Sequence, residues 1–166
     1  MSTDDTHATL WKLIKDVRFA MVTHRHVDGT LHAHPLTTAN KDFDENKTLY
    51  FLIKSDSDIA HCISSGDAQV NASYADPDAD TYVSVAGVAS LNDSVALKDA
   101  LWSPAAKAWF PGGPQDAHLV VLAVRIDFAE YWDVKESKFV QLIKMAKAAV
   151  TGEPPTQMGE HKTLRP

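Results

Sequence analysis

The sequence has one cysteine, few basic residues and no long apolar run, and each shortage excludes a class of protein. Cys62 is the only cysteine, so the chain cannot form an internal disulfide. Lysine and arginine number 16 against 22 acidic residues, which gives a net charge of −6 and argues against nucleic-acid binding. No apolar run reaches membrane-spanning length, and the acidic start lacks the layout of a secretory signal. We therefore expect a cytoplasmic protein with no nucleic-acid or membrane partner.

Motifs for phosphate loops and nucleophilic catalysis are also lacking. The chain contains neither GxGxxG nor GxxxxGK[ST], the glycine-rich patterns that cradle phosphates. Its spacings support no Ser-His-Asp arrangement and no pair of catalytic carboxylates. Cys62 has no motif beside it and is predicted to be an inert core residue. The sequence therefore assigns no catalytic side chain.

What the chain does contain is an ordinary globular composition, with 45% hydrophobic and 23% charged residues. Its 166 residues suffice for one domain with a sizeable core and are too few for two ordinary domains. We expect this domain to cover residues 1–150. Residues 151–166 are poor in apolar side chains, and we expect a C-terminal tail that is flexible or docked.

Apolar patterning predicts mainly strands joined in hairpins. The expected strands are Phe19–Thr23, Leu31–Thr38, Thr48–Ile53, Ala68–Tyr74, Tyr82–Leu91, and Leu119–Ile126 continued by Phe128–Asp133. The expected helices are Ala8–Lys15, a short helix from Ser55 or Ser57 to about Ser64, a helix capped by Asp93 that runs through Leu101, and Phe139–Val150. Gly87 interrupts an alternating strand, as glycines do at bulges and barrel corners. The pattern predicts a closed or nearly closed antiparallel β-barrel with helices.

Four of the eight histidines flank one predicted turn: His24, His26, His32 and His34. Histidines two apart on a strand point to the same face, which suggests a metal site. With Asp28-Gly29 as a two-residue turn, however, His24 pairs with Ala33, and the two pairs of histidines fall on opposite faces. Only a loop with an odd number of residues would bring all four together. We therefore expect ordinary polar strand positions here and no metal site.

Two other segments could hold a ligand. Ser55-Asp56-Ser57 follows a buried strand where a helix opens, so its hydroxyls could receive an anion, with plain helix capping as the alternative. Trp109 and Phe110 precede a Pro-Gly-Gly-Pro breaker, so a rigid loop could present an aromatic face to a flat ligand. The alternative for both aromatics is that they plug the end of the barrel.

The chain resembles a known family through segments that follow one another along nearly its whole length: FAMVTH, HPLTT, YFLIKSDSD, QVNASYADPDADTYVSVAGVA, WSPAAKAWFPGG, AEYWD and TGEPP…GEHK. The family is the general stress protein 26 branch of the pyridoxamine 5′-phosphate oxidase-like, FMN-binding split-barrel superfamily. The most specific elements are WFPGG, the YADPD–SVAG strand pair and EYWD. The resemblance implies a six-stranded antiparallel split barrel that dimerises, with flavin mononucleotide (FMN) at the dimer interface.

The resemblance also implies which residues contact the flavin. They are His34, Leu36, Thr37 and Thr38 on the second strand, Lys54, Ser55, Asp56 and Ser57 near the phosphate, and Trp109 from the partner chain. His34 stands where many members have an arginine, and Ile59 lies where many have a lysine soon after the serine. We therefore expect low FMN affinity unless Lys54 substitutes, and tighter binding when lysine replaces Ile59.

The expected function is that of a stress-related FMN-binding protein, a flavin-dependent oxidoreductase whose chemistry belongs to the flavin. FAD or a weakly held flavin is the alternative cofactor. A non-enzymatic flavin-binding or sensing module is the alternative function, and a haem or deazaflavin binder is a third. The basic cluster of a true pyridoxamine phosphate oxidase is not visible after Trp132, so that reaction is not expected. We also expect an obligate homodimer, because Leu119–Ile126 and the Trp-Phe loop are strongly apolar.

Overall fold

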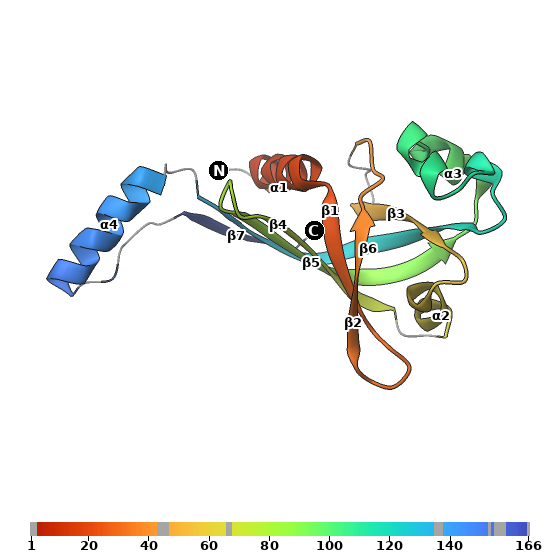
Figure 1. Ribbon diagram of the computed structural model, residues 1–166, viewed down its shortest axis with the longest axis horizontal. Helices are drawn as coiled ribbons and strands as arrows, with labels where there is room; N and C mark the ends of the chain where they lie inside the picture. Colours follow the sequence, from red (N-terminus) through yellow and green to blue (C-terminus); the bar gives the residue numbers. More distant parts are fainter. Residues whose placement is uncertain are drawn as a thin grey trace.

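The computed structural model describes residues 3–42, 47–65, 68–134, 138–152, 154 and 159–165 (Figure 1). Its strands are β1 (Phe19–Arg25), β2 (Leu31–Thr37), β3 (Thr48–Lys54), β4 (Gln69–Asp76), β5 (Thr81–Asn92), β6 (Leu119–Asp133) and β7 (Glu160–Leu164). Its helices are α1 (Thr3–Val17), α2 (Asp58–Ser64), α3 (Val95–Leu101) and α4 (Lys138–Thr151), with 3₁₀ turns at Pro104–Ala108 and Gly113–Gln115.

The strands form one antiparallel sheet in the order β2-β1-β4-β5-β6-β3, and β7 pairs with the second half of β6. The two ends of this order meet where Thr38, just after β2, pairs with Phe51 of β3. The Ala39 amide adds a hydrogen bond of 2.8 Å to the carbonyl of Tyr50. The sheet therefore curls into a barrel whose closing contact is short, which confirms the predicted mainly β split barrel with helices.

The core lies inside this curled sheet and beneath α1 (Figure 1). Val22, Phe51, Val85 and Leu122 are fully buried, and they come from four different strands. The amphipathic spacing of α1 places Leu10 and Ile14 against the sheet, as helical periodicity predicts. No helix of the described ranges is long and apolar enough to cross a membrane.

Gly87 marks the predicted irregularity in β5. The register between β5 and β6 shifts between Ala86 and Gly87, so that Ala86 pairs with Phe128 while Gly87 pairs with Ile126. Asp127 is left as the extra residue of a β-bulge. A Cβ atom on Gly87 would lie 2.2 Å from the carbonyl oxygen of Arg125, so only glycine lets the two backbones approach this closely.

The register of the β1–β2 hairpin corrects our sequence prediction. His24 pairs with His32, not with Ala33. The amide of His26 donates to the carbonyl of Thr30 at 2.8 Å, which leaves a loop of three residues that ends at Gly29 with φ +86°. A three-residue loop with glycine in the left-handed region is a common hairpin connection. Because the loop has an odd number of residues, all four histidines lie on one face.

The chain leaves the barrel after β6 and returns to it at β7. Helix α4 projects away from the barrel (Figure 1). Residues Glu160–Leu164 then form β7 along the second half of β6, where Leu164 is buried in the core and His161 stacks on Trp132. This part of the predicted tail therefore joins the sheet.

Candidate functional site

The seam between β2 and β3 is where the structure brings two predicted flavin-binding segments together. If the register of the Thr38–Phe51 bridge is extended, Leu36 stands level with Ile53 and His34 stands level with Ser55. No strand ladder joins these residues in the described part of the chain. The segments His34–Thr38 and Lys54–Ser57 thus face each other across the seam between β2 and β3, where the described residues form the Thr38–Phe51 bridge.

The β2 side of the seam contains one residue with a clear structural role. Thr38 is buried, and its hydroxyl shares a hydrogen bond of 2.7 Å with the hydroxyl of Tyr74. Burial raises the pKa of Tyr74 far above its usual value, so the phenol stays protonated. Leu36 is half-buried against the core, and Thr37 is exposed. Thr38 therefore ties the seam to the core, while Leu36 and Thr37 form its wall.

The β3 side of the seam ends in a polar turn. Lys54, Ser55 and Asp56 are exposed. Ser57 is the N-cap of α2: its hydroxyl donates to the Lys54 carbonyl at 2.6 Å and accepts from the Ala60 amide at 3.4 Å. Ser57 therefore caps the helix, and Lys54 and Ser55 offer the accessible cation and hydroxyl.

The burial of Ile59 corrects the expectation that lysine at this position would contact a phosphate. Ile59 is only 2% exposed and packs in the hydrophobic core beneath α2. Its neighbour Asp58, at the first position of the helix, is exposed. A side chain at position 59 therefore points to the core, not to the polar turn, and Ile59 is a packing residue.

The two adjacent aromatics have different environments. Phe110 is 4% exposed, whereas Trp109 is 72% exposed. The loop after them is held by Asp116, whose carboxylate accepts from the amides of Gly112 and His118, each at 2.9 Å. These hydrogen bonds lower the pKa of Asp116. The loop therefore buries Phe110 and presents Trp109 to the surface, so the expectation that both aromatics plug the barrel is wrong for Trp109.

A hollow of about 410 Å³ lies near the bulge and was missed by the sequence analysis. Its walls include His24 of β1, Asn71 of β4, Gly87 of β5 and Asp127 of β6. None of these belongs to the predicted flavin set. The glycine that interrupts β5 was the available signal, because bulges often re-aim neighbouring side chains beside functional sites.

The histidine face of the hairpin gives the protein a pH-dependent element. His24 is buried and its Nε2 lies 3.2 Å from Nε2 of His34. Burial, followed by the charges that His34, His32 and His26 would carry when protonated, lowers the pKa of His24. The folded protein therefore resists protonation at this position.

We expect the stability to decrease on acidification through this histidine. Below the unfolded-state pKa of about 6.5, the unfolded chain binds a proton that folded His24 does not, so the free energy of unfolding falls by up to about 1.4 kcal/mol per pH unit. Above that pH, His24 is neutral in both the folded and the unfolded chain, so its contribution to the free energy of unfolding does not change with pH. Urea titrations from pH 8 to pH 5 measure the slope. The His24→Gln variant should have a shallower slope, and an unchanged slope would rule out His24 as the titrating group.

Comparisons with known proteins show which family this chain resembles. The family model described as pyridoxamine 5′-phosphate oxidase like matches residues 5–156. General stress protein 26 of Bacillus subtilis is 47% identical over 45 residues, which are 27% of this chain and only 31% of that protein's length.

Two solved structures extend the likeness over most of the chain. One, described as a general stress protein 26 from Jannaschia sp. CCS1, has a TM-score of 0.76 and 24% identity and covers 98% of this chain and 99% of its own. The general stress FMN/FAD binding protein of Xanthomonas citri has a TM-score of 0.69 and 27% identity and covers 81% of this chain and 92% of its own. With the matched family model, the split barrel and the seam, these similarities lead to one conclusion: the chain belongs to the pyridoxamine 5′-phosphate oxidase-like family.

Proposed function

We propose that this protein binds FMN along the β2–β3 seam and acts as a flavin-dependent oxidoreductase in a stress response. The observation that supports the proposal is the Thr38–Phe51 bridge, whose extended register sets His34–Thr38 opposite the end of β3 and the polar turn Lys54–Ser57. The Xanthomonas citri relative, 27% identical, is described as an FMN/FAD binding protein of the general stress class. That description supports a flavin as the ligand here.

The residues of the seam fit a flavin that is held with modest strength. Lys54 offers one exposed cation and Ser55 one hydroxyl to a phosphate, while Leu36 offers an apolar wall to a ring. Asp56 is exposed beside them and would oppose a phosphate dianion. The ring of His34 is stacked against His24, with its Nε2 3.2 Å from Nε2 of His24, and it lacks the fork of donors that a guanidinium offers. Because Lys54 attracts the phosphate while Asp56 repels it, we expect this turn to bind FMN more weakly than a site with an arginine guanidinium would.

A bound flavin would supply the hydride or electron transfer, and the protein would supply binding, orientation and exclusion of water. Thr38 and its bond to Tyr74 would hold the β2 wall in position. Ser57, by capping α2, would hold the polar turn. In this proposal no side chain of the chain needs to react.

Titration of the purified protein with FMN tests this function. We expect flavin fluorescence to be quenched on binding and Lys54→Gln to weaken binding about tenfold, because a hydrogen bond to a charged group contributes about 1.5–3 kcal/mol. Lys15→Gln on α1 is the matched control, and its FMN affinity should not change. Absence of saturable FMN or FAD binding would overturn the proposal. Binding without NAD(P)H turnover would instead identify a non-enzymatic flavin module.

We further propose that the protein is a homodimer, with the flavin at its interface. Large apolar side chains are exposed on the outer face of the sheet, including Phe19 (67%), Met21 (45%) and Tyr82 (42%). Leu119–Ile126, which the sequence analysis had used as the argument for dimerisation, is largely buried within the single chain. The outer sheet face is therefore the better-supported contact surface.

Light scattering should give twice the chain mass of 18.2 kDa at micromolar concentration. Met21→Arg should shift the equilibrium towards monomer, since it places a charge on the exposed apolar face. Lys15→Gln on α1 should remain dimeric. A well-folded wild-type monomer would contradict the interface.

Trp109 is assigned to cover the flavin of the partner chain. Because the side chain is 72% exposed, Trp109→Ala should leave the melting temperature of cofactor-free protein nearly unchanged. FMN binding should weaken by about 1 kcal/mol, since an aromatic contact to the ring is lost. Calorimetry and FMN titration measure the two effects. A large fall in melting temperature with unchanged affinity would instead make Trp109 a packing residue.

A further inference from the structure

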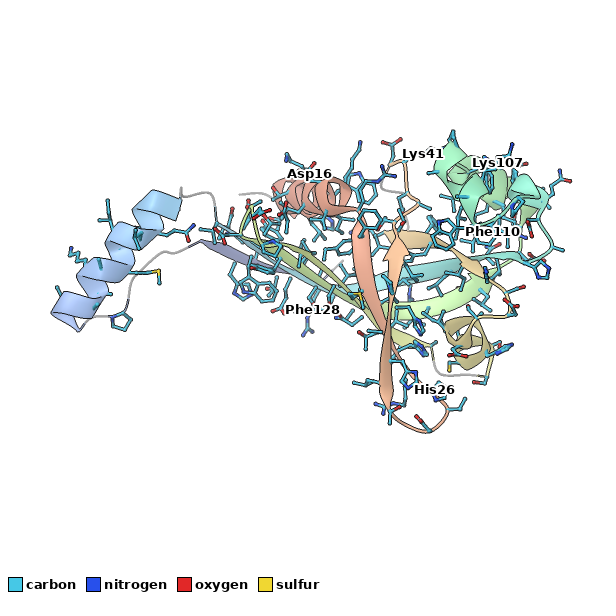
Figure 2. The ribbon with its side chains drawn as sticks, viewed as in Figure 1. Asp16, His26, Lys41, Lys107, Phe110 and Phe128 are labelled. Atoms are coloured by element: carbon cyan, nitrogen blue, oxygen red, sulfur yellow. The ribbon has the colours of Figure 1, made fainter. Side chains whose placement is uncertain are left out.

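The β1–β2 hairpin carries a concentration of imidazoles that the proposed flavin function does not explain. Its odd-numbered loop places His24 directly opposite His32 and brings His26 and His34 onto the same face. The rings of His26 and His32 stack with centroids 4.3 Å apart. Figure 2 shows His26 near the tip of this hairpin, which projects from the barrel.

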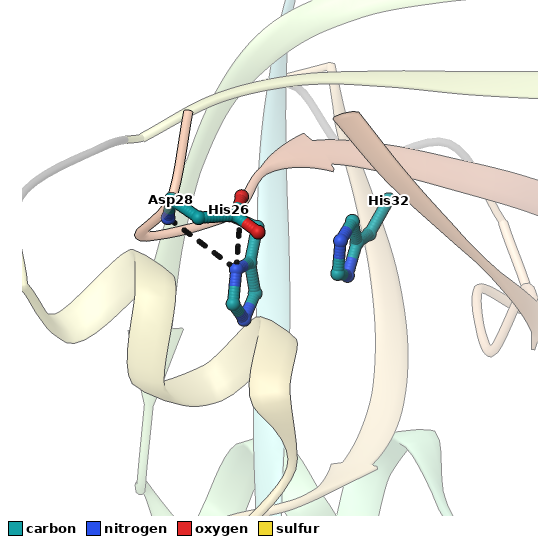
Figure 3. A group of neighbouring side chains, drawn as sticks. All are labelled: His26, Asp28 and His32. Atoms are coloured by element: carbon teal, nitrogen blue, oxygen red, sulfur yellow. Dashed lines mark hydrogen bonds and ion pairs between the residues drawn. The ribbon is translucent and has the colours of Figure 1, made fainter. Parts of the chain in front are cut away.

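We propose that the hairpin binds one divalent transition-metal ion through His26, Asp28 and His32. The candidate ligand atoms of these three residues all lie within 4.8 Å of one another. Figure 3 shows the Asp28 carboxylate above the His26 ring and the His32 ring to one side, with dashed lines from His26 Nδ1 to the carboxylate and to the Asp28 amide nitrogen. The distance from His26 Nδ1 to Asp28 Oδ1 is 3.2 Å. Two ligands of a tetrahedral zinc ion, each about 2.0–2.1 Å from the metal, are separated by about 3.3 Å, so the imidazole and the carboxylate group already stand at about that spacing. The carboxylate would have to turn to bring its other oxygen, Oδ2, to the ion.

The carboxylate is prepared for a cation. Asp28 Oδ1 accepts hydrogen bonds from the amide and the hydroxyl of Thr30, at 2.9 and 2.6 Å. These bonds lower the pKa of Asp28 to about 2, so the group is ionised at neutral pH. All of these contacts go to Oδ1, and Oδ2 remains available to a metal. The negative charge needed beside two neutral imidazoles is thus held in place by the loop.

The ligand set and its exposure indicate the kind of ion. Two imidazoles and one carboxylate suit Zn²⁺, Ni²⁺ or Cu²⁺ better than Mg²⁺ or Ca²⁺, which prefer oxygen ligands. The rings of His26 and His32 lie almost parallel, at 9°, and an imidazole binds a metal in its ring plane, so the two rings must turn out of their stack to converge on one ion. Both rings are half-buried and Asp28 is exposed at the hairpin tip. Three protein ligands leave a further position open to water, as in exchangeable or catalytic sites.

The second histidine pair supports the site without belonging to the assigned ligands. His24 is buried, and its ring meets His32 edge-on with centroids 6.1 Å apart. His34 stacks on the other side of His24 at 5.2 Å. His24 and His34 therefore limit the movement of His32 towards the barrel. We assign the ion to His26, Asp28 and His32 because this group includes a carboxylate, whereas His24 and His34 supply imidazoles alone.

Metal titration of the full-length, chelator-stripped protein tests this proposal without flavin. We expect one equivalent of Zn²⁺ to bind in competition with a chromophoric chelator, and Co²⁺ to give visible ligand-field bands. His26→Ala and His32→Ala should each weaken binding at least tenfold, and so should Asp28→Asn, which keeps the hydrogen-bond acceptor of the loop but removes the charge. Affinity should also fall at acidic pH as imidazoles are protonated.

His118→Gln is the matched control, because this exposed histidine lies at the start of β6 outside the hairpin. Its metal affinity should equal that of the wild type, and circular dichroism should show every variant folded. Unchanged affinity in His26→Ala or His32→Ala would overturn the proposal. The absence of saturable binding up to about 100 μM metal, which corresponds to a dissociation constant weaker than that value, would also overturn it. Loss of binding in His24→Ala and His34→Ala but not in His26→Ala would overturn the assigned ligands.

Discussion

Replacing Gly87 with alanine should destabilise the protein by at least about 3 kcal/mol, a large part of the roughly 5–15 kcal/mol by which ordinary domains are stable. The new Cβ would lie 2.2 Å from the Arg125 carbonyl oxygen and 2.9 Å from Cγ1 of Val124. The oxygen belongs to the backbone of β6, so relief requires the β5–β6 ladder to separate at the bulge. Chemical denaturation, or the yield of folded protein, measures the loss.

Gly29→Ala gives the matched comparison. Gly29 has φ +86°, but a Cβ there has no atom within 4 Å. Only backbone strain is expected, at about 1–2 kcal/mol. If Gly87→Ala were no more harmful than Gly29→Ala, the close approach of β5 to β6 would not be needed for the fold.

Ile59→Lys should destabilise the protein by about 4 kcal/mol or more and should not tighten FMN binding. The substitution removes a side chain that is 2% exposed and places an ammonium group in the hydrophobic core cluster. Both the lost packing and the burial of an unpaired charge oppose folding. Thermal and urea denaturation of the variant measure the cost.

Asp58→Lys is the control for added charge on α2. Asp58 is exposed at the first position of the helix, so the change should cost less than about 1 kcal/mol through the helix dipole. A stable Ile59→Lys protein with improved FMN affinity would show that position 59 reaches the phosphate. That result would also show that the side chain at position 59 does not lie in the core.

The seam illustrates how far sequence reasoning reached in locating the candidate site. The resemblance singled out His34–Thr38 and Lys54–Ser57, and the Thr38–Phe51 bridge brings the strands that carry them side by side, while their contact with a flavin stays a prediction. The roles inside these segments depended on tertiary contacts. The Thr38 hydroxyl is hydrogen-bonded to Tyr74, a residue 36 positions away in the sequence. No local sequence pattern predicts that hydrogen bond.

Capping shows a smaller limit of local reasoning. Asp93 was the expected cap of α3, but the Ser94 hydroxyl accepts from the Leu97 amide. Asp93 pairs instead with Lys98, a buried lysine of the same helix. Both residues are good caps, and only the path of the chain out of β5 selects between them.

Local sequence patterns were sufficient to predict the first six strands, the amphipathic α1, the bulge at Gly87 and the polar turn before α2. These features depend on local periodicity, on glycine's missing side chain and on capping chemistry. Tertiary structure alone decided the register of the histidine hairpin, because one additional loop residue moves a whole strand face from one side to the other. It also decided that Phe110 is buried while Trp109 is exposed, and that Glu160–Leu164 pairs with β6. These outcomes depend on which surface a segment meets after the chain has folded back, and neighbouring residues do not encode that surface.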